Sequence, residues 1–359
     1  MRELPRVDFN ERPLIVIWEV TRACALACRH CRAEAIPRRD PNELTFEEGC
    51  RLIDQVKELD PPLFVLTGGD PFMRKDLPEL IRYATSIGLR VSSSPSGTRL
   101  ANLANMKRCA EAGLKRVAFS LDHADEEAHD AFRGVRGSYR WTMEGIAAAR
   151  EAGLVVQIGT TVSRHNWKVL DRIARKVEEI GVALWSLFFH IPTGRGQMED
   201  MLTAEENEQV LEWLADYSRT APFPIKTTEA PHWRRVLLQK GMEIPVQGVN
   251  DGKGFIFISH TGEVNPSGFL PWNAGNVRET TLAKIYRESE VFLALRDPRK
   301  LKGRCGACEY REICGGSRAR AFAVYGDWLE EDPGCCYVPP GYRAKAGAEA
   351  ETAAGTPAL

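Results

Sequence analysis

Cysteine is the residue type of this sequence best suited to chemistry, because ten cysteines occur and most of them fall in two groups. The first group is Cys24, Cys28 and Cys31, on one short segment. Three thiolates at this spacing can hold three irons of a 4Fe–4S cluster and leave the fourth iron open to a chelating substrate. The alternative is a zinc site, in which His30 would be a fourth ligand with awkward geometry. Spacing alone leaves both interpretations open.

A second group of cysteines lies near the other end of the chain. Its four members are Cys305, Cys308, Cys314 and Cys335. Four thiolates can close a second 4Fe–4S cluster or a structural zinc site, and the spacing does not favour one over the other. Cys335 is the natural fourth ligand, although its neighbour Cys336 could replace it.

Composition narrows the class of protein. The chain has 43% hydrophobic and 27% charged residues, with 48 basic against 49 acidic side chains and a net charge of −1. This balance argues against a nucleic-acid partner held by bulk electrostatics. No apolar run approaches the roughly 18 residues of a membrane span, and no apolar leader is visible. We therefore expect a cytoplasmic protein whose cysteines serve metal or redox chemistry rather than disulfides.

The elements that must position the first cysteines follow a repeated pattern. A helical segment ends in glycine and an apolar run follows at once, as after Gly113 and Gly153. The expected strands include Leu14–Val20, Leu63–Thr67, Val117–Leu121, Leu154–Val162 and Val182–Phe189. A capping box of Thr45 and Glu48 opens a helix that runs through Leu59. We count six strands with helices between them, which predicts an α/β fold with a parallel sheet, either a partial barrel or doubly wound.

The pattern changes after about residue 200. Residues 203–219 are expected to be helical, and the proline-rich stretch 221–250 to be a connection. Phe255–Ser259 and Glu263–Asn265 are expected to form a hairpin, followed by a helix near 280–296. The predicted units are residues 12–200, a helical and proline-rich connection at 201–250, a cysteine-bearing unit at 251–342, and a disordered tail at 343–359.

The first cysteine segment resembles the signature of the radical S-adenosylmethionine (SAM) superfamily, Cx3Cx2C after the first strand. The resemblance places His30 beside the adenine of SAM. Thr67–Pro71, at the end of the second strand, is similar to the superfamily's GGE-type motif, with aspartate in place of glutamate. The superfamily binds the methionine amine there, through the backbone at Gly68, Gly69 and Asp70.

Two more strand ends carry residues that match the superfamily. Ser120 and Asp122 end the fourth strand, where polar residues usually meet the ribose or the methionine carboxylate. Arg195 lies in a turn that resembles the PxGRG turn of the family. The resemblance implies a partial (β/α)6 TIM-type barrel that reductively cleaves SAM to a 5′-deoxyadenosyl radical, with an electron donor such as flavodoxin or ferredoxin. It assigns no catalytic acid or base.

The second cysteine group resembles the SPASM or twitch extension of radical SAM maturases, which implies an auxiliary 4Fe–4S cluster. Ser267 and Arg318 stand where the fuller pattern has further cysteines, so one auxiliary cluster is expected. The stretch from Cys305 to Ala321 is similar to the haem-biosynthesis branch, which implies a tetrapyrrole substrate whose side chains are oxidatively decarboxylated. The alternatives are a maturase of a ribosomally made peptide and a non-enzymatic iron–sulfur redox sensor.

Overall fold

The computed structural model describes residues 7–244 and 248–343. The described residues form one nine-stranded sheet in the order β7-β6-β5-β4-β3-β2-β1-β8-β9. All neighbouring strands are parallel except β8 and β9. The strands are β1 (Ile15–Glu19), β2 (Leu63–Thr67), β3 (Val91–Ser93), β4 (Arg116–Ser120), β5 (Val155–Val162), β6 (Trp185–Phe189), β7 (Ile225–Thr228), β8 (Phe255–Ile258) and β9 (Val264–Asn265).

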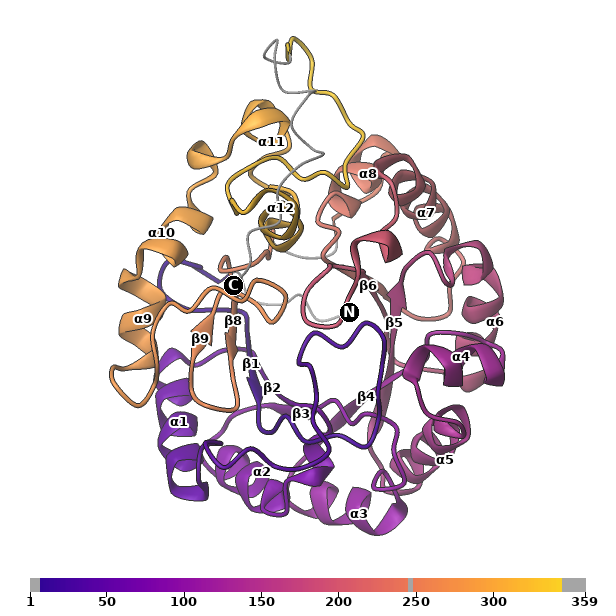
Figure 1. The fold of residues 1–359 in the computed structure, drawn as a ribbon, viewed down its shortest axis with the longest axis vertical. Helices are drawn as coiled ribbons and strands as arrows, with labels where there is room; N and C mark the ends of the chain where they lie inside the picture. Colours follow the sequence, from indigo (N-terminus) through magenta and orange to yellow (C-terminus); the bar gives the residue numbers. More distant parts are fainter. Residues whose placement is uncertain (1–6, 245–247, 344–359) are drawn as a thin grey trace.

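The sheet curls into part of a barrel, and helices cover its outer face (Figure 1). The helices of the barrel are α1 (Phe46–Leu59), α2 (Leu77–Ser86), α3 (Leu103–Glu111), α4 (Glu126–Arg133), α5 (Ser138–Glu151), α6 (Leu170–Ile180), α7 (Ala204–Tyr217) and α8 (Trp233–Gln239). Side chains such as Trp18, Phe64 and Phe119 are fully buried between sheet and helices. The expected α/β fold with a partial barrel is confirmed.

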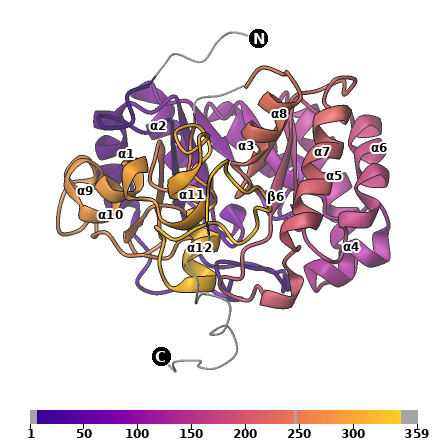
Figure 2. The ribbon, with the colours of Figure 1, turned by 90° about the horizontal axis from the view of Figure 1, so that it is seen from above.

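The later helices are α9 (Leu282–Glu288), α10 (Glu290–Arg296), α11 (Gly303–Ala307) and α12 (Arg318–Tyr325). They begin beside α1, with α9, and continue to α11 close to α8 (Figure 2). α12 and its neighbouring loops lie between the two ends of the curled sheet (Figure 1). The second cysteine group therefore lies where the barrel is left open.

Two expectations about the second half of the chain were wrong in detail. The stretch expected to be a plain connection contains β7 and α8, and β7 pairs in parallel with β6. Its prolines flank the strand instead of interrupting it, so the β-branched run from Ile225 to Thr228 can pair. The helix expected near 280–296 is two helices, because Ser289 between them is extended.

Other local predictions are confirmed. Thr45 and Glu48 form the capping box that begins α1. Gly113 and Gly153 follow their helices with φ of +108° and +76°, the left-handed region that favours glycine. The hairpin of β8 and β9 is present, and β8 also joins the barrel sheet beside β1. The predicted disordered tail lies outside the described residues, except for residue 343.

Candidate active site

A cavity opens at the carboxyl ends of the barrel strands, where a parallel α/β sheet places its chemistry. It has about 1040 Å³ of empty space and is open to solvent. The three cysteines of the first group all line it. Five of the seven residues that the sequence predicts to bind SAM also line it, namely His30, Gly68, Gly69, Ser120 and Arg195. Asp70 and Asp122 are buried beside the cavity and do not line it.

The glycines after β2 let two backbone segments pack closely. The Gly69 N–H donates to Thr21 O, and the Asp70 N–H donates to Ala23 O, each at 2.7 Å. A Cβ atom on Gly69 would lie 2.5 Å from the carbonyl oxygens of Arg22 and Ala23. Only glycine can therefore hold the turn against the start of the cysteine loop.

Asp70 acts on its neighbours from a fully buried position. Its Oδ1 accepts a hydrogen bond from the Phe72 N–H at 3.2 Å, and its Oδ2 accepts one from Thr98 Oγ1 at 2.6 Å. Burial raises the pKa of this carboxyl above its usual value. The geometry makes Asp70 a residue that fixes the turn after β2.

Arg195 fixes the cysteine loop from the opposite side. Its Nε donates to Cys28 O at 3.0 Å, its backbone N–H donates to Cys31 O at 3.0 Å, and Nη1 donates to Ala35 O at 3.3 Å. Its Nη2 is buried and has no hydrogen-bond partner among the described residues. The Nη2 nitrogen of Arg195 is thus left to donate to a group bound beside the loop.

His30 supplies an uncharged aromatic face beside the cysteines. Its ring stacks on Phe132, with centroids 4.1 Å apart and planes 12° apart. Burial lowers the pKa of His30 to about 3, so the ring is neutral at neutral pH. Its Nδ1 is buried and unpartnered, which suits a residue that packs against a bound heterocycle.

The buried surroundings of Cys24 and Cys28 favour their protonated thiols. Burial raises the pKa of Cys24 to about 11 and also raises that of Cys28. The Arg133 Nη1 lies 3.8 Å from Cys28 Sγ and partly opposes that shift. Backbone N–H groups face two sulfurs, Leu26 N at 3.4 Å from Cys24 Sγ and Ala35 N at 3.5 Å from Cys31 Sγ. These donors fit thiolates that have exchanged their protons for iron.

Asp122 holds Arg133 beside the loop. The two side chains form a buried ion pair, and Asp122 Oδ1 also accepts the Thr161 N–H at 2.7 Å. Burial by itself would raise the pKa of Asp122, but Arg133 and the neighbouring His30 and His129 hold it below its usual value. The structure therefore places Asp122 as the counterion of Arg133, while Ser120 faces the cavity.

The second cysteine group lines a separate opening with about 420 Å³ of empty space. The cysteines that line it are Cys305, Cys308, Cys314 and Cys335, while Cys336 does not. No three His, Cys, Asp or Glu side chains of the described residues are placed to bind one ion directly. The four thiols instead surround a space, which fits a cluster of several irons.

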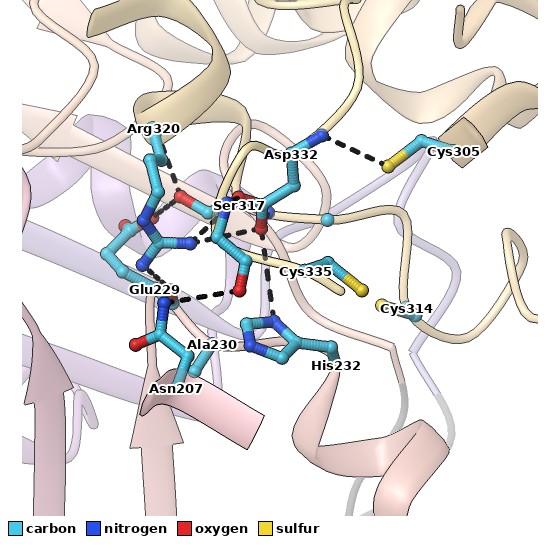
Figure 3. Close-up of polar contacts among 12 residues, drawn as sticks. Asn207, Glu229, Ala230, His232, Cys305, Cys314, Ser317, Arg320, Asp332 and Cys335 are labelled. Atoms are coloured by element: carbon cyan, nitrogen blue, oxygen red, sulfur yellow. Dashed lines mark hydrogen bonds and ion pairs between the residues drawn. The ribbon is translucent and has the colours of Figure 1, made fainter. Parts of the chain in front are cut away.

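A network of buried hydrogen bonds lies next to the second cysteine site (Figure 3). The Asp332 N–H donates to Cys305 Sγ at 3.3 Å, and the Asp332 carboxylate accepts both bonds from Arg320 Nη1, at 2.9 and 3.0 Å. Ser317 Oγ donates to Glu229 Oε2 at 2.5 Å. Sequence reasoning missed Glu229, because it follows β7 in a stretch where only a connection was expected.

The fold and the cysteine loop define an enzyme that binds SAM on an open 4Fe–4S cluster, and the chain belongs to the radical SAM superfamily, whose profile matches residues 18–177. The AdoMet-dependent heme synthase of Oleidesulfovibrio alaskensis is 44% identical, over 90% of this chain and 87% of the relative. The AdoMet-dependent heme synthase of Methanosarcina barkeri is 39% identical, over 93% of this chain and 99% of the relative.

Solved structures share the fold at low sequence identity. SuiB of Streptococcus suis, solved with bound S-adenosylmethionine, has a TM-score of 0.73 at 16% identity, over 91% of this chain and 78% of that one. The same protein has been solved with its precursor peptide SuiA. In the described residues no helix is both long and apolar enough to cross a membrane.

Proposed function

We propose that this radical SAM enzyme oxidatively decarboxylates propionate side chains of an iron porphyrin in haem biosynthesis, in the cytoplasm. The observation that carries the proposal is similarity along nearly the whole chain to proteins named AdoMet-dependent heme synthase, at 44% and 39% identity. It covers the barrel and the second cysteine site together.

Different residues of the cavity bind the cluster and the separate parts of SAM. Cys24, Cys28 and Cys31 hold the first cluster. His30 packs beside the adenine, and the backbone after β2 binds the methionine amine. Ser120 faces the ribose or carboxylate of SAM. Bound SAM and its cluster supply a 5′-deoxyadenosyl radical, which removes a hydrogen atom from the substrate.

The electron balance of the reaction requires an acceptor for one electron, a role that the second site can fill. A propionate becomes a vinyl group when it loses one hydrogen atom, CO2 and one electron. An auxiliary 4Fe–4S cluster on Cys305, Cys308, Cys314 and Cys335 would accept that electron and pass it on. Flavodoxin or ferredoxin would supply the electron that cleaves SAM.

A peptide maturase is the second candidate function. The fold is shared with SuiB, which has been solved with a precursor peptide. That structure is 16% identical to this chain, so it supports the fold and leaves the substrate to be tested. The redox-sensor alternative is disfavoured because the chain belongs to an enzyme superfamily.

The test is anaerobic turnover of the reconstituted full chain with SAM, dithionite and iron-coproporphyrin III. We expect 5′-deoxyadenosine to form together with vinyl-bearing porphyrin. The Cys28→Ser variant should form neither, whereas Cys50→Ser, which changes a cysteine in α1 outside both sites, should match the wild type. Formation of 5′-deoxyadenosine without any change in the porphyrin would contradict the proposed substrate.

A further inference from the structure

Arg318 is a buried cation without an acidic partner. Its side chain is 1% exposed, at the start of α12. Its Nε donates to Gly316 O at 3.2 Å, and Nη1 donates to the carbonyls of Trp328 and Glu330 at 2.9 and 2.6 Å. Among the described residues, no carboxylate lies within ion-pair distance of this guanidinium. A buried charge requires compensation, and neutral carbonyls alone provide no opposite charge.

The remaining nitrogen of Arg318 faces the second cysteine site. Nη2 lies 3.6 Å from Cys305 Sγ. Gly316 makes this approach possible, because a Cβ there would lie 2.5 Å from Arg318 Nη2 and 2.9 Å from Cys305 Sγ. Gly316 also has a φ of +67°, which suits glycine. The backbone is thus shaped to bring a guanidinium against a sulfur.

Carboxylates near Arg318 already have other partners. Asp332 is bound by Arg320, and Asp327 is paired with Lys302. Asp251 accepts hydrogen bonds from the backbone N–H groups of Arg318 and Ala319, and it forms no ion pair with the Arg318 guanidinium. Arg318 acts on Asp327 only at longer range than Lys302 does, and none of these carboxylates forms an ion pair with it.

A second arginine repeats the arrangement on another side of the site. The Arg234 guanidinium donates to Ile313 O at 3.0 Å and to Val249 O at 2.7 Å, and it too lacks a carboxylate partner among the described residues. By contrast, Arg235 is paired with Glu208 and Arg304 with Glu331. Among the arginines around the site, Arg311 also lines the opening and lacks a carboxylate partner in the described residues, but its side chain is exposed and its charge is solvated. Arg318, which is buried, and Arg234, which is largely shielded from solvent, are the less exposed arginines beside the cysteines whose charge no carboxylate pairs.

We propose that Arg318, assisted by Arg234, balances the negative charge of the auxiliary cluster and raises its reduction potential. This inference rests on the proposed auxiliary cluster. Four thiolates give the cluster a net negative charge that grows by one on reduction, so a fixed buried cation favours the reduced state. The interaction is buried, so added salt screens it little.

The test isolates the second site in the full-length chain. A variant with Cys24, Cys28 and Cys31 all changed to Ala holds iron only at the second site. In this background, the midpoint potential is read from the reduced-cluster signal in electron paramagnetic resonance during a redox titration. At fixed potential, Arg318→Met should lower the ratio of reduced to oxidised cluster at least tenfold, which corresponds to about 59 mV for one electron.

Two variants separate charge from structure. Arg318→Lys keeps the charge and should stay closer to the parent potential than Arg318→Met. The double variant Arg235→Met/Glu208→Gln removes a neutral pair whose guanidinium lies 4.0 Å from Cys335 Sγ, and it should leave the potential almost unchanged. If Arg318→Met does not retain iron, Arg234→Met takes its place and should also lower the potential.

Each outcome decides between distinct claims. A normal iron content with an unchanged midpoint in Arg318→Met, or in Arg234→Met where that replaces it, would overturn this inference and leave the auxiliary cluster standing. An Arg318→Lys chain that shifts as far as Arg318→Met would also overturn it. Absence of iron from the second site of the parent variant would overturn both this inference and the proposed auxiliary cluster.

Discussion

Individual residues around the first cysteines act mainly through the backbone. Arg195 donates hydrogen bonds to carbonyls of the loop, and Gly69, which lacks a Cβ, lets the loop backbone pack against the end of β2. These contacts hold the backbone of the loop, and iron binding requires that its buried thiols give up their protons. A change that moves the backbone should affect cluster binding as strongly as the loss of a ligand.

Gly69→Ala tests this dependence on the backbone. The added Cβ would meet two carbonyl oxygens at 2.5 Å, so the turn or the loop must shift. We expect a loss of about 1–3 kcal/mol in the free energy of unfolding and reduced iron at the first site, measured by denaturation and iron analysis. In the control Gly153→Ala, no atom lies within 4 Å of the new Cβ, so only backbone strain of about 1 kcal/mol is expected. Equal iron retention in the two variants would contradict the account.

Cys335 and Cys336 give a second test at the residue scale. Cys335 lines the second opening and Cys336 does not. Both changes are made in the variant that has Ala at positions 24, 28 and 31. There, Cys335→Ser should lose most of its iron and of the visible absorbance of the iron–sulfur cluster. Cys336→Ser should keep both. The reverse result would assign the fourth ligand to Cys336.

Much of the candidate site could be predicted from residue spacing, because ligands on one short loop stay close in any fold. The roles of Asp122 and Arg195 could not be predicted in full. Their partners, Arg133 and the carbonyls of the cysteine loop, are distant in sequence and meet only through the curled sheet. For the same reason the sequence carries no signal for the contact between Glu229 and Ser317.

The elements of the barrel join the two halves of the chain. β8 pairs with β1, and β7 pairs with β6, so segments from the second half extend both ends of the sheet. The strands β3–β6 could be predicted from the repeat of a helix, a glycine and an apolar run, and β1 and β2 from their apolar runs alone. β7 could not, because it is four residues long and flanked by prolines that typify a loop.

An ion pair between elements predicts a dependence of stability on pH. Arg278, from the loop before α9, donates to both carboxylate oxygens of Glu48 in α1, at 2.8 and 3.0 Å. The Arg278 hydrogen bonds, followed by the backbone N–H of Thr45, lower the pKa of Glu48 from 4.5 to about 2. A lowered pKa means that the stabilisation is complete above pH 4.5 and is lost as the pH falls towards 2.

Glu48→Gln should therefore lower the free energy of unfolding at pH 7 by up to about 1 kcal/mol, the range of partly exposed ion pairs. The deficit relative to the wild type should shrink between pH 4.5 and 2, as followed by chemical denaturation. The matched control is Glu47→Gln, an exposed change in the same first turn, which should show a smaller deficit. A constant deficit for Glu48→Gln across this pH range would contradict the assignment.

At the scale of the whole molecule, α12 joins the second cysteine site to the barrel. It lies between the ends of the curled sheet (Figure 1), with Arg318 against Cys305 and Arg320 bonded to Glu229 O at the end of β7. One cavity fits SAM and its cluster, and the other fits a closed cluster that takes up an electron. This division matches a reaction that removes a hydrogen atom and an electron from one substrate.

Transfer of deuterium tests the central claim most directly. Iron-coproporphyrin III deuterated at the propionate carbon next to the macrocycle is turned over anaerobically with SAM and dithionite, and the 5′-deoxyadenosine is analysed by mass spectrometry. The account predicts 5′-deoxyadenosine carrying one deuterium, formed in step with vinyl groups and CO2. Unlabelled 5′-deoxyadenosine beside an unchanged porphyrin would contradict it.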